Sequence, residues 1–136
     1  MSPTDALQAT LAGEHAAVYV LGVLGARSRT PGLTDRLRSA YDAHVTQRDA
    51  LTERIRALGA TPVGPAAAYA VPARLTREVD LRAAALQVER RCAALYLEQL
   101  PATTGEDRRM LATSLAASAV RELTLGGKPE DLPGTK

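Results

Sequence analysis

The sequence has no phenylalanine, no tryptophan and a single cysteine. An apolar content made up largely of Ala and Leu suits helices that pack closely on helices, whereas sheets favour β-branched and aromatic residues. Because Cys92 stands alone, an internal disulfide and a cysteine-rich metal site are excluded. The chain has 136 residues, 46% of them hydrophobic, and this predicts one all-α domain with a core of its own.

The sequence also lacks an excess of either charge, since 17 basic residues face 15 acidic ones. The basic residues are scattered, so no block or stripe indicates binding to nucleic acid or to a membrane. Residues 1–8 lack the basic-then-apolar pattern of a secretory signal, and no apolar run approaches the roughly 20 residues of a spanning helix. We therefore expect a cytoplasmic protein.

Four amphipathic segments, separated by Pro and Gly, predict four helices over about residues 3–27, 33–58, 75–100 and 104–126. Short loops join the first two and the last two, which predicts two antiparallel hairpins. The middle connection is long and rich in Pro. About 14 extended residues cover roughly 43 Å, and a 26-residue helix is roughly 39 Å long. The connection can therefore cross the whole bundle and place the second and third helices parallel, as in ferritin-like bundles. Residues 1–127 are expected to form the bundle and residues 128–136 a flexible tail.

Polar residues interrupt the apolar stripe of each predicted helix, at Glu14, His44, Glu89 and Ser118. Glu14 and His44 are 30 residues apart, and Glu89 and Ser118 are 29 apart, which predicts a repeated hairpin with these residues at one level. A buried carboxylate must be paired, protonated or bound to a cation. A cluster of carboxylates and an imidazole would suit a hard or borderline divalent metal.

This pattern resembles the ferritin-like di-iron carboxylate proteins, in which each hairpin supplies one Glu from its first helix and a Glu-x-x-His pair from its second. Glu14 and Glu89 match the two lone glutamates, and His44 matches one histidine. The other three ligand positions hold Tyr41, Ser118 and Arg121. The resemblance therefore implies the fold with a degenerate di-iron site.

A closer resemblance covers nearly the whole chain and is to a family of short actinobacterial ferritin-like domains with no assigned activity. It is carried by four stretches: Glu14-His15-Ala16-Ala17-Val18-Tyr19, Gly59-Ala60-Thr61-Pro62, Ala68-Tyr69-Ala70-Val71-Pro72 and Leu132-Pro133-Gly134. These motifs imply a fold more than a reaction. No catalytic residue is assigned, because the sequence has no Gly-rich phosphate loop and no Ser/His/Asp arrangement that the helices could assemble.

Three functional hypotheses remain open. The favoured one is a non-catalytic structural or interaction module, without a cofactor, that forms a homodimer because its Ala- and Leu-rich stripes can pack a second copy. Its glutamates would belong to a buried polar network with the following residues: Tyr41, His44, Arg48, Ser118, Arg121 and Glu122.

The second hypothesis is a metal-handling protein or oxidase, in which Glu14, His44 and Glu89 bind iron or manganese, with Glu122 or Cys92 as a further ligand. The third concerns the segment Leu123-Thr124-Leu125-Gly126-Gly127-Lys128, which is faintly similar to the C-terminal peptides that dock cargo inside encapsulin shells. In that case the C-terminus would bind a partner or a shell.

Overall fold

The computed structural model describes residues 1–72 and 75–135, and within them it contains four α-helices and no strand. The helices are α1 (Pro3–Arg27), α2 (Pro31–Ala57), α3 (Glu78–Gln99) and α4 (Gly105–Thr124), and a short 3-10 turn, η1 (Leu100–Ala102), lies between α3 and α4. The all-α prediction is confirmed. The third helix begins three residues later than predicted, and Leu75 instead packs into the core from the segment before it.

The first helix begins with a capping box, which the sequence Ser2-Pro3-Thr4-Asp5 supplies. The Ser2 side chain accepts a hydrogen bond from the Asp5 amide, and the Asp5 carboxylate accepts one from the Ser2 amide. These bonds satisfy amides that have no partner within the helix. After α2, Gly59 has a φ of +80°, a conformation that only glycine adopts easily.

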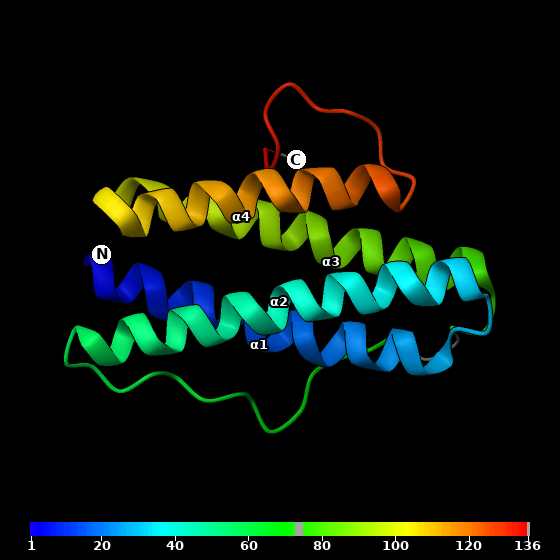
Figure 1. The fold of residues 1–136 in the computed structure, drawn as a ribbon, viewed down its shortest axis with the longest axis horizontal. Helices are drawn as coiled ribbons and strands as arrows, with labels where there is room; N and C mark the ends of the chain where they lie inside the picture. Colours follow the sequence, from blue (N-terminus) through cyan, green and yellow to red (C-terminus); the bar gives the residue numbers. More distant parts are fainter. Residues whose placement is uncertain (73–74, 136) are drawn as a thin grey trace.

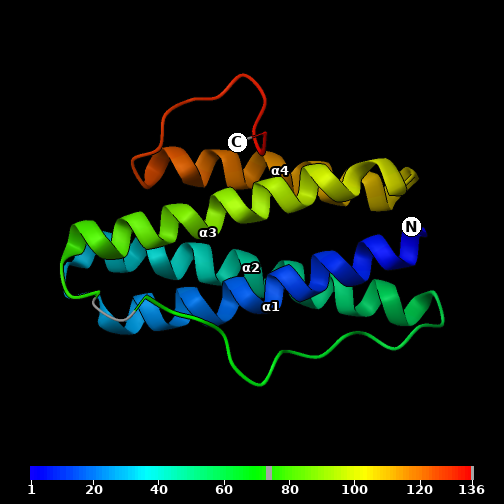
Figure 2. The same ribbon diagram turned by 180° about the vertical axis from the view of Figure 1, so that it is seen from behind.

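The connection between α2 and α3 crosses the full length of the bundle (Figure 1). It leaves α2 at one end and enters α3 at the other, so α2 and α3 run parallel while each hairpin is antiparallel (Figure 2). The predicted long crossover is therefore confirmed.

The crossover is bound to α1 through specific contacts. The Gln8 side chain donates to the Thr61 carbonyl oxygen at 2.7 Å and accepts from the Val63 amide at 2.8 Å. His15 Nε2 lies 2.9 Å from the Val63 carbonyl oxygen, and the rings of Tyr19 and Tyr69 are 5.2 Å apart. The segment therefore has a defined path over the surface of the first hairpin.

The apolar core is divided into two clusters along the bundle axis. The smaller cluster contains Leu7, Leu11, Leu51, Ile55 and Leu111, and the larger one gathers side chains from the opposite half of the helices. Glu14 and His44 lie between the two clusters in the sequences of α1 and α2, whereas Glu89 of α3 lies among members of the larger cluster. The four polar side chains, Glu14, His44, Glu89 and Ser118, all lie near the middle of the bundle.

One helix, α1, is long and apolar enough to cross a membrane by length and composition, although no such segment was expected from the sequence. Core helices of soluble proteins meet the same criterion. Here α1 packs against both α2 and α3 and carries the fully buried Glu14. Cytoplasmic localisation stays a prediction.

The C-terminal tail loops away from α4 and then returns to the bundle (Figure 1). Gly134 has a φ of +87°, and a Cβ at this position would lie 2.6 Å from the Ala93 carbonyl oxygen on α3. Only glycine allows such a close approach in this conformation. The tail is described as far as Thr135, and Lys136 lies outside the described residues. Its predicted flexibility stays a prediction.

Candidate functional site: a buried ion network at the bundle centre

Each helix contributes one polar side chain to the centre of the bundle. These are Glu14 from α1, His44 from α2, Glu89 from α3 and Ser118 from α4, and none is more than 1% exposed. They are buried because the positions three, four or seven residues away on the same helix face carry core side chains. Hydrogen bonds within and between the two hairpins join these four side chains into one network.

The imidazole of His44 bridges the two glutamates. Its Nδ1 lies 2.6 Å from Glu14 Oε2, and its Nε2 lies 2.8 Å from Glu89 Oε1. Both ring nitrogens thus face carboxylate oxygens, which accept hydrogen bonds and do not donate them when ionised. With both glutamates ionised, both contacts are satisfied only when His44 is a doubly protonated imidazolium.

Further donors complete the hydrogen bonding of each carboxylate. Ser118 Oγ donates to Glu89 Oε2, and Arg121 Nε donates to Glu89 Oε1, both at 2.9 Å. On the other side of the ring, the Tyr96 hydroxyl donates a short hydrogen bond to Glu14 Oε1. Every carboxylate oxygen of Glu14 and Glu89 therefore has a partner, as buried charges require.

Electrostatics favour the charged form of this network. Burial lowers the pKa of His44, but the hydrogen bonds and negative charges of Glu14 and Glu89 outweigh burial and raise it to about 9. Burial raises the pKa of Glu89, yet His44 and Arg121 outweigh it and hold that pKa below its ordinary value. At neutral pH, the Glu89 carboxylate therefore lies between the His44 imidazolium and the Arg121 guanidinium.

Two residues predicted to belong to the network lie outside it. Tyr41 is 36% exposed, and Arg48 pairs with the neighbouring Asp49 at 2.9 Å. At about 100° per residue, both side chains point roughly 40–60° away from His44, toward the same edge of α2. The buried arc of α2 lies on the other side, where Ala40 and Leu51 are core residues. The predicted stripe was thus placed too far round the helix.

Glu122 and Cys92, considered as further metal ligands, are both buried. Within the described part of the chain, Glu122 forms no side-chain hydrogen bond to the network, and burial followed by the charge of Glu130 raises its pKa. Burial, together with the charges of Glu14 and Glu89, raises the pKa of the Cys92 thiol well above its ordinary value. Cys92 is therefore a protonated core thiol at neutral pH.

Tyr96 is the member of the network that sequence reasoning missed. It lies on α3 and is only 1% exposed. The available signal was its position two turns after Glu89 on the same face of α3. A buried tyrosine needs a hydrogen-bond acceptor, and Glu14 on the adjacent helix supplies it.

Comparison with known proteins now assigns the family. The model of DUF4439, a domain of unknown function, matches residues 6–136. The chain belongs to the DUF4439 family. The match includes the C-terminal tail as well as the four helices, so the tail is part of the DUF4439 unit. No curated protein matches the sequence significantly.

Three solved structures place the DUF4439 chain in the ferritin-like fold. A conserved hypothetical protein of Mycobacterium tuberculosis, rv2844, is 30% identical with a TM-score of 0.82, over 94% of this chain and 93% of that one. A dodecameric thioferritin, the bacterioferritin-related protein from Bacteroides fragilis, is 21% identical with a TM-score of 0.77, over 90% and 81%. A Dps mutant from Listeria innocua is 16% identical with a TM-score of 0.79, over 95% and 96%. The predicted ferritin-like fold is thereby confirmed.

The geometry of this DUF4439 domain differs from that of a metal centre. Among residues 1–72 and 75–135, no group of three or more His, Cys, Asp or Glu side chains is arranged to hold a metal ion. The reason is the position of His44, whose ring lies between the two carboxylates instead of beside them. A metal ion would require this ring to lose a proton and to turn away from one glutamate.

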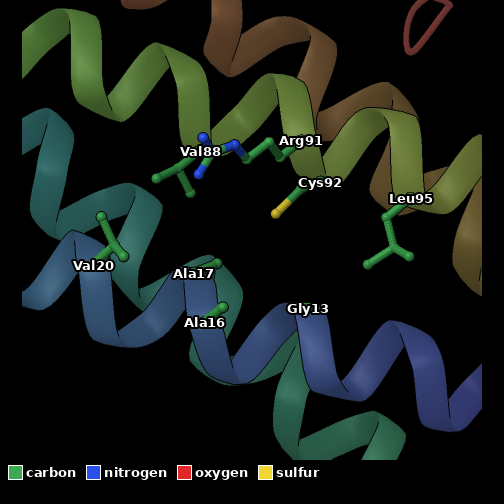
Figure 3. A pocket seen from close by; sticks show the side chains of 8 residues that line it. All are labelled: Gly13, Ala16, Ala17, Val20, Val88, Arg91, Cys92 and Leu95. Atoms are coloured by element: carbon green, nitrogen blue, oxygen red, sulfur yellow. The ribbon is translucent and has the colours of Figure 1, made fainter. Parts of the chain in front are cut away.

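A small pocket opens next to the network, between α1 and α3 (Figure 3). Its volume is about 220 Å³, and its lining residues are Gly13, Ala16, Ala17, Val20, Val88, Arg91, Cys92 and Leu95. The Cys92 sulfur points toward α1 across this space (Figure 3). Since the walls are otherwise apolar except for Arg91, the pocket adds no carboxylate or imidazole ligand to the network.

Proposed function

We propose that this DUF4439 domain is a non-catalytic structural or interaction module whose ferritin-like core is stabilised by a buried ion network in the place of a metal. The observation that carries the proposal is the bridging position of His44, with a carboxylate oxygen within 2.8 Å of each ring nitrogen. An imidazolium in this position has no lone pair to give to a metal. Its charge, together with that of Arg121, supplies the positive charge that a bound cation would otherwise bring.

The rival hypothesis is that Glu14, His44 and Glu89 bind iron or manganese. Metal binding would first require His44 to lose a proton. With a pKa of about 9, deprotonation at pH 7 costs roughly 3 kcal/mol, and the ion would also have to break the hydrogen bonds to both glutamates. These terms favour the metal-free network.

The test is elemental analysis of untagged protein that has been purified without chelator and then incubated with Fe(II) or Mn(II) under anaerobic conditions. We expect far less than one equivalent of metal per chain. The Glu14→Gln/Glu89→Gln variant, which lacks both carboxylates, serves as the matched control. One metal per chain in the wild type that is absent from this variant would refute the proposal and support metal handling or oxidase chemistry.

We further propose that the module acts as a homo-oligomer, with the outer face of the first hairpin as the contact surface. Tyr19 and Tyr41 are exposed there, and they line a groove of about 690 Å³ together with Tyr69 of the crossover. Exposed aromatic side chains on a hollowed surface are typical of protein interfaces. The Bacteroides fragilis relative, described as dodecameric, supports assembly in principle.

Sedimentation velocity tests this surface directly. We expect the wild type to sediment as an oligomer and the Tyr19→Asp/Tyr41→Asp variant as a monomer with an unchanged helical spectrum. A matched control is Val79→Asp, since Val79 is 60% exposed but lies on α3, away from this face. A monomeric wild type, or equal dissociation in the control, would contradict the proposed interface.

Docking through the segment Leu123–Lys128 finds less support. Leu125 is only 3% exposed and packs with the larger core cluster. Gly127 donates a hydrogen bond from its amide to the Glu122 carbonyl oxygen at 2.8 Å, which closes the end of α4. A peptide that is already part of the helix end and of the core would have to unfold before a shell or partner could bind it.

A further inference from the structure

The small pocket between α1 and α3 shares no lining residue with the ion network or with the proposed oligomer surface (Figure 3). Its floor consists of core side chains, since Ala17 is 3% exposed, Cys92 5% and Val88 8%. One end is closed by Leu95, which lies so close to α1 that a Cβ at Gly13 would overlap its Cδ2 atom. The pocket therefore reaches the side chains of the core.

The walls of this pocket offer very little to water. Apart from Arg91, the lining residues carry only aliphatic groups, the thiol of Cys92 or, at Gly13, no side chain. Protein cores are packed almost as densely as crystals, and voids larger than a water molecule are few. Water in an apolar space finds few hydrogen-bond partners, and its replacement by an apolar group is favourable. The pocket therefore favours an apolar occupant.

The size of the pocket limits this occupant. An apolar cavity of about 150 Å³ holds a benzene ring, so a space of about 220 Å³ has room for an apolar body of roughly six to eight carbon atoms. The Cys92 sulfur points into this space (Figure 3). Because its pKa is raised, the thiol adds a polarisable contact and no charge.

The rim of the pocket carries one cation, Arg91. Its exposed side chain extends along α3 toward Val88, three residues earlier on the same helix (Figure 3). On the side facing the tail, Arg91 and Glu130 both line a second cavity. Within residues 1–72 and 75–135, however, Arg91 forms no ion pair with Glu130 or with any other carboxylate. Its guanidinium can therefore pair with an anionic group at the mouth of the pocket.

We propose that this pocket binds a medium-chain monocarboxylate such as octanoate, with the alkyl chain inside and the carboxylate paired with Arg91. The apolar walls and the volume fit the chain, and the charge of Arg91 is complementary to the head group. An arginine fork presents two N–H groups to the two oxygens of a carboxylate. No side chain of the ion network or of the proposed oligomer surface takes part, so this site can be tested separately from both.

The experiment follows the methyl signals of the full-length protein, ¹³C-labelled at Val and Leu, during titration with octanoate below its micelle-forming concentration. The methyl groups of Val20, Val88 and Leu95 line the pocket. Val79 and Val120 do not line it and are 60% and 61% exposed. We expect saturable shifts of the first three signals only. A non-saturating response, or equal shifts of Val79 and Val120, would overturn the proposal.

Two further ligands separate the contribution of the chain from that of the head group. Octan-1-ol has the same chain without the charge and should bind about tenfold more weakly, the effect of one charge-assisted hydrogen bond. Acetate has the head group without the chain and should cause no saturable shift. Equal affinities for octanoate and octan-1-ol, or saturable binding of acetate, would overturn the proposal.

Two arginine variants test the pairing of the head group. Arg91→Met should weaken octanoate binding about tenfold and leave the binding of octan-1-ol unchanged. Arg36→Met removes the same charge from the exposed face of α2 and should change neither affinity. Equal effects of the two variants on octanoate would assign the effect to net charge and overturn the proposal.

A third pair of variants tests the location. Ala16→Leu places a larger side chain in the pocket and should abolish saturable binding of octanoate. Ala12→Leu, at an exposed position one turn earlier on α1, is the matched control and should leave binding unchanged. Undiminished binding in Ala16→Leu would overturn the proposed location. Arg91→Met, which alters an exposed side chain, keeps the test decisive if Ala16→Leu does not fold.

Discussion

At the scale of single residues, the ionisation of His44 is the property with the most direct consequence. Its pKa rises from an ordinary 6.5 to about 9 in the folded protein, because Glu14 and Glu89 outweigh the effect of burial. Burial raises the pKa values of the neighbouring Tyr96 and Cys92, so neither side chain becomes charged near neutral pH. His44 therefore controls how stability depends on pH between these two values.

A raised pKa stabilises the fold fully below the unfolded value and loses this contribution as the pH rises through the folded value. Between pH 6.5 and pH 9, we expect the free energy of unfolding in urea to fall by about 3 kcal/mol. His15→Gln should show the same decline, because His15 lies at the surface beneath the crossover. A flat profile in the wild type would mean that His44 is neutral in the folded state.

A second residue-scale prediction concerns the hydroxyl of Tyr96. Tyr96→Phe keeps the ring but leaves Glu14 Oε1 without its donor in a fully buried position. We expect a loss of roughly 1–3 kcal/mol in the free energy of unfolding. Tyr41→Phe is the matched control and should change stability by less than about 0.5 kcal/mol, because Tyr41 is exposed at the surface. Equal effects of the two substitutions would show that the hydrogen bond to Glu14 contributes little.

The sequence predicted the centre of the network but not its edges, and the reason is geometric. Glu14, His44 and Glu89 could be found because a polar residue within an apolar stripe is conspicuous and because helix periodicity fixes its level. Tyr41 and Arg48 were misassigned because a single row of side chains along a helix does not show how far around the helix the buried face extends. Tyr96 was missed because tyrosine is compatible with an apolar stripe, and its acceptor comes from another helix.

At the scale of elements, the path of the connecting segments was easier to predict than which face of each helix is buried. The crossover could be inferred because its length and Pro content allow it to span the bundle, and length is read directly from sequence. Val79 illustrates the opposite case. As an apolar residue of the predicted third helix it would suit the core, but it is 60% exposed, whereas Leu81, Ala85 and Val88 are buried. The choice between neighbouring stripes depends on where α1 and α4 pack, which sequence alone does not fix.

The tail supplies a prediction at this scale. Gly134→Ala places a Cβ against the Ala93 carbonyl oxygen and requires a left-handed conformation, so the tail should detach from α3. We expect a Glu-specific protease to cleave faster after Glu130, detected by mass spectrometry, while the thermal midpoint of the helices changes little. Gly32→Ala, where a Cβ meets nothing within 4 Å, is the control and should leave cleavage unchanged.

At the scale of the whole molecule, the buried ion network connects all four helices. Removing one partner of a buried ion pair destabilises the fold. The intact pair need not add to the net stability, because transferring each charge from water to the interior is costly. The network can therefore specify which helix faces meet without adding to the net stability of the fold. Replacing it as a unit distinguishes these two contributions.

We expect His44→Leu alone to lose about 3–5 kcal/mol, because it leaves two buried carboxylates without their shared partner. Adding Glu14→Met, Glu89→Met, Tyr96→Phe, Ser118→Ala and Arg121→Met removes every partner of the network. This apolar variant should recover most of the lost stability in urea unfolding, since well-packed apolar replacements of buried ion pairs are often neutral or stabilising. A variant less stable than His44→Leu would instead show that the charges themselves, and not only their mutual pairing, hold the two halves of the bundle together.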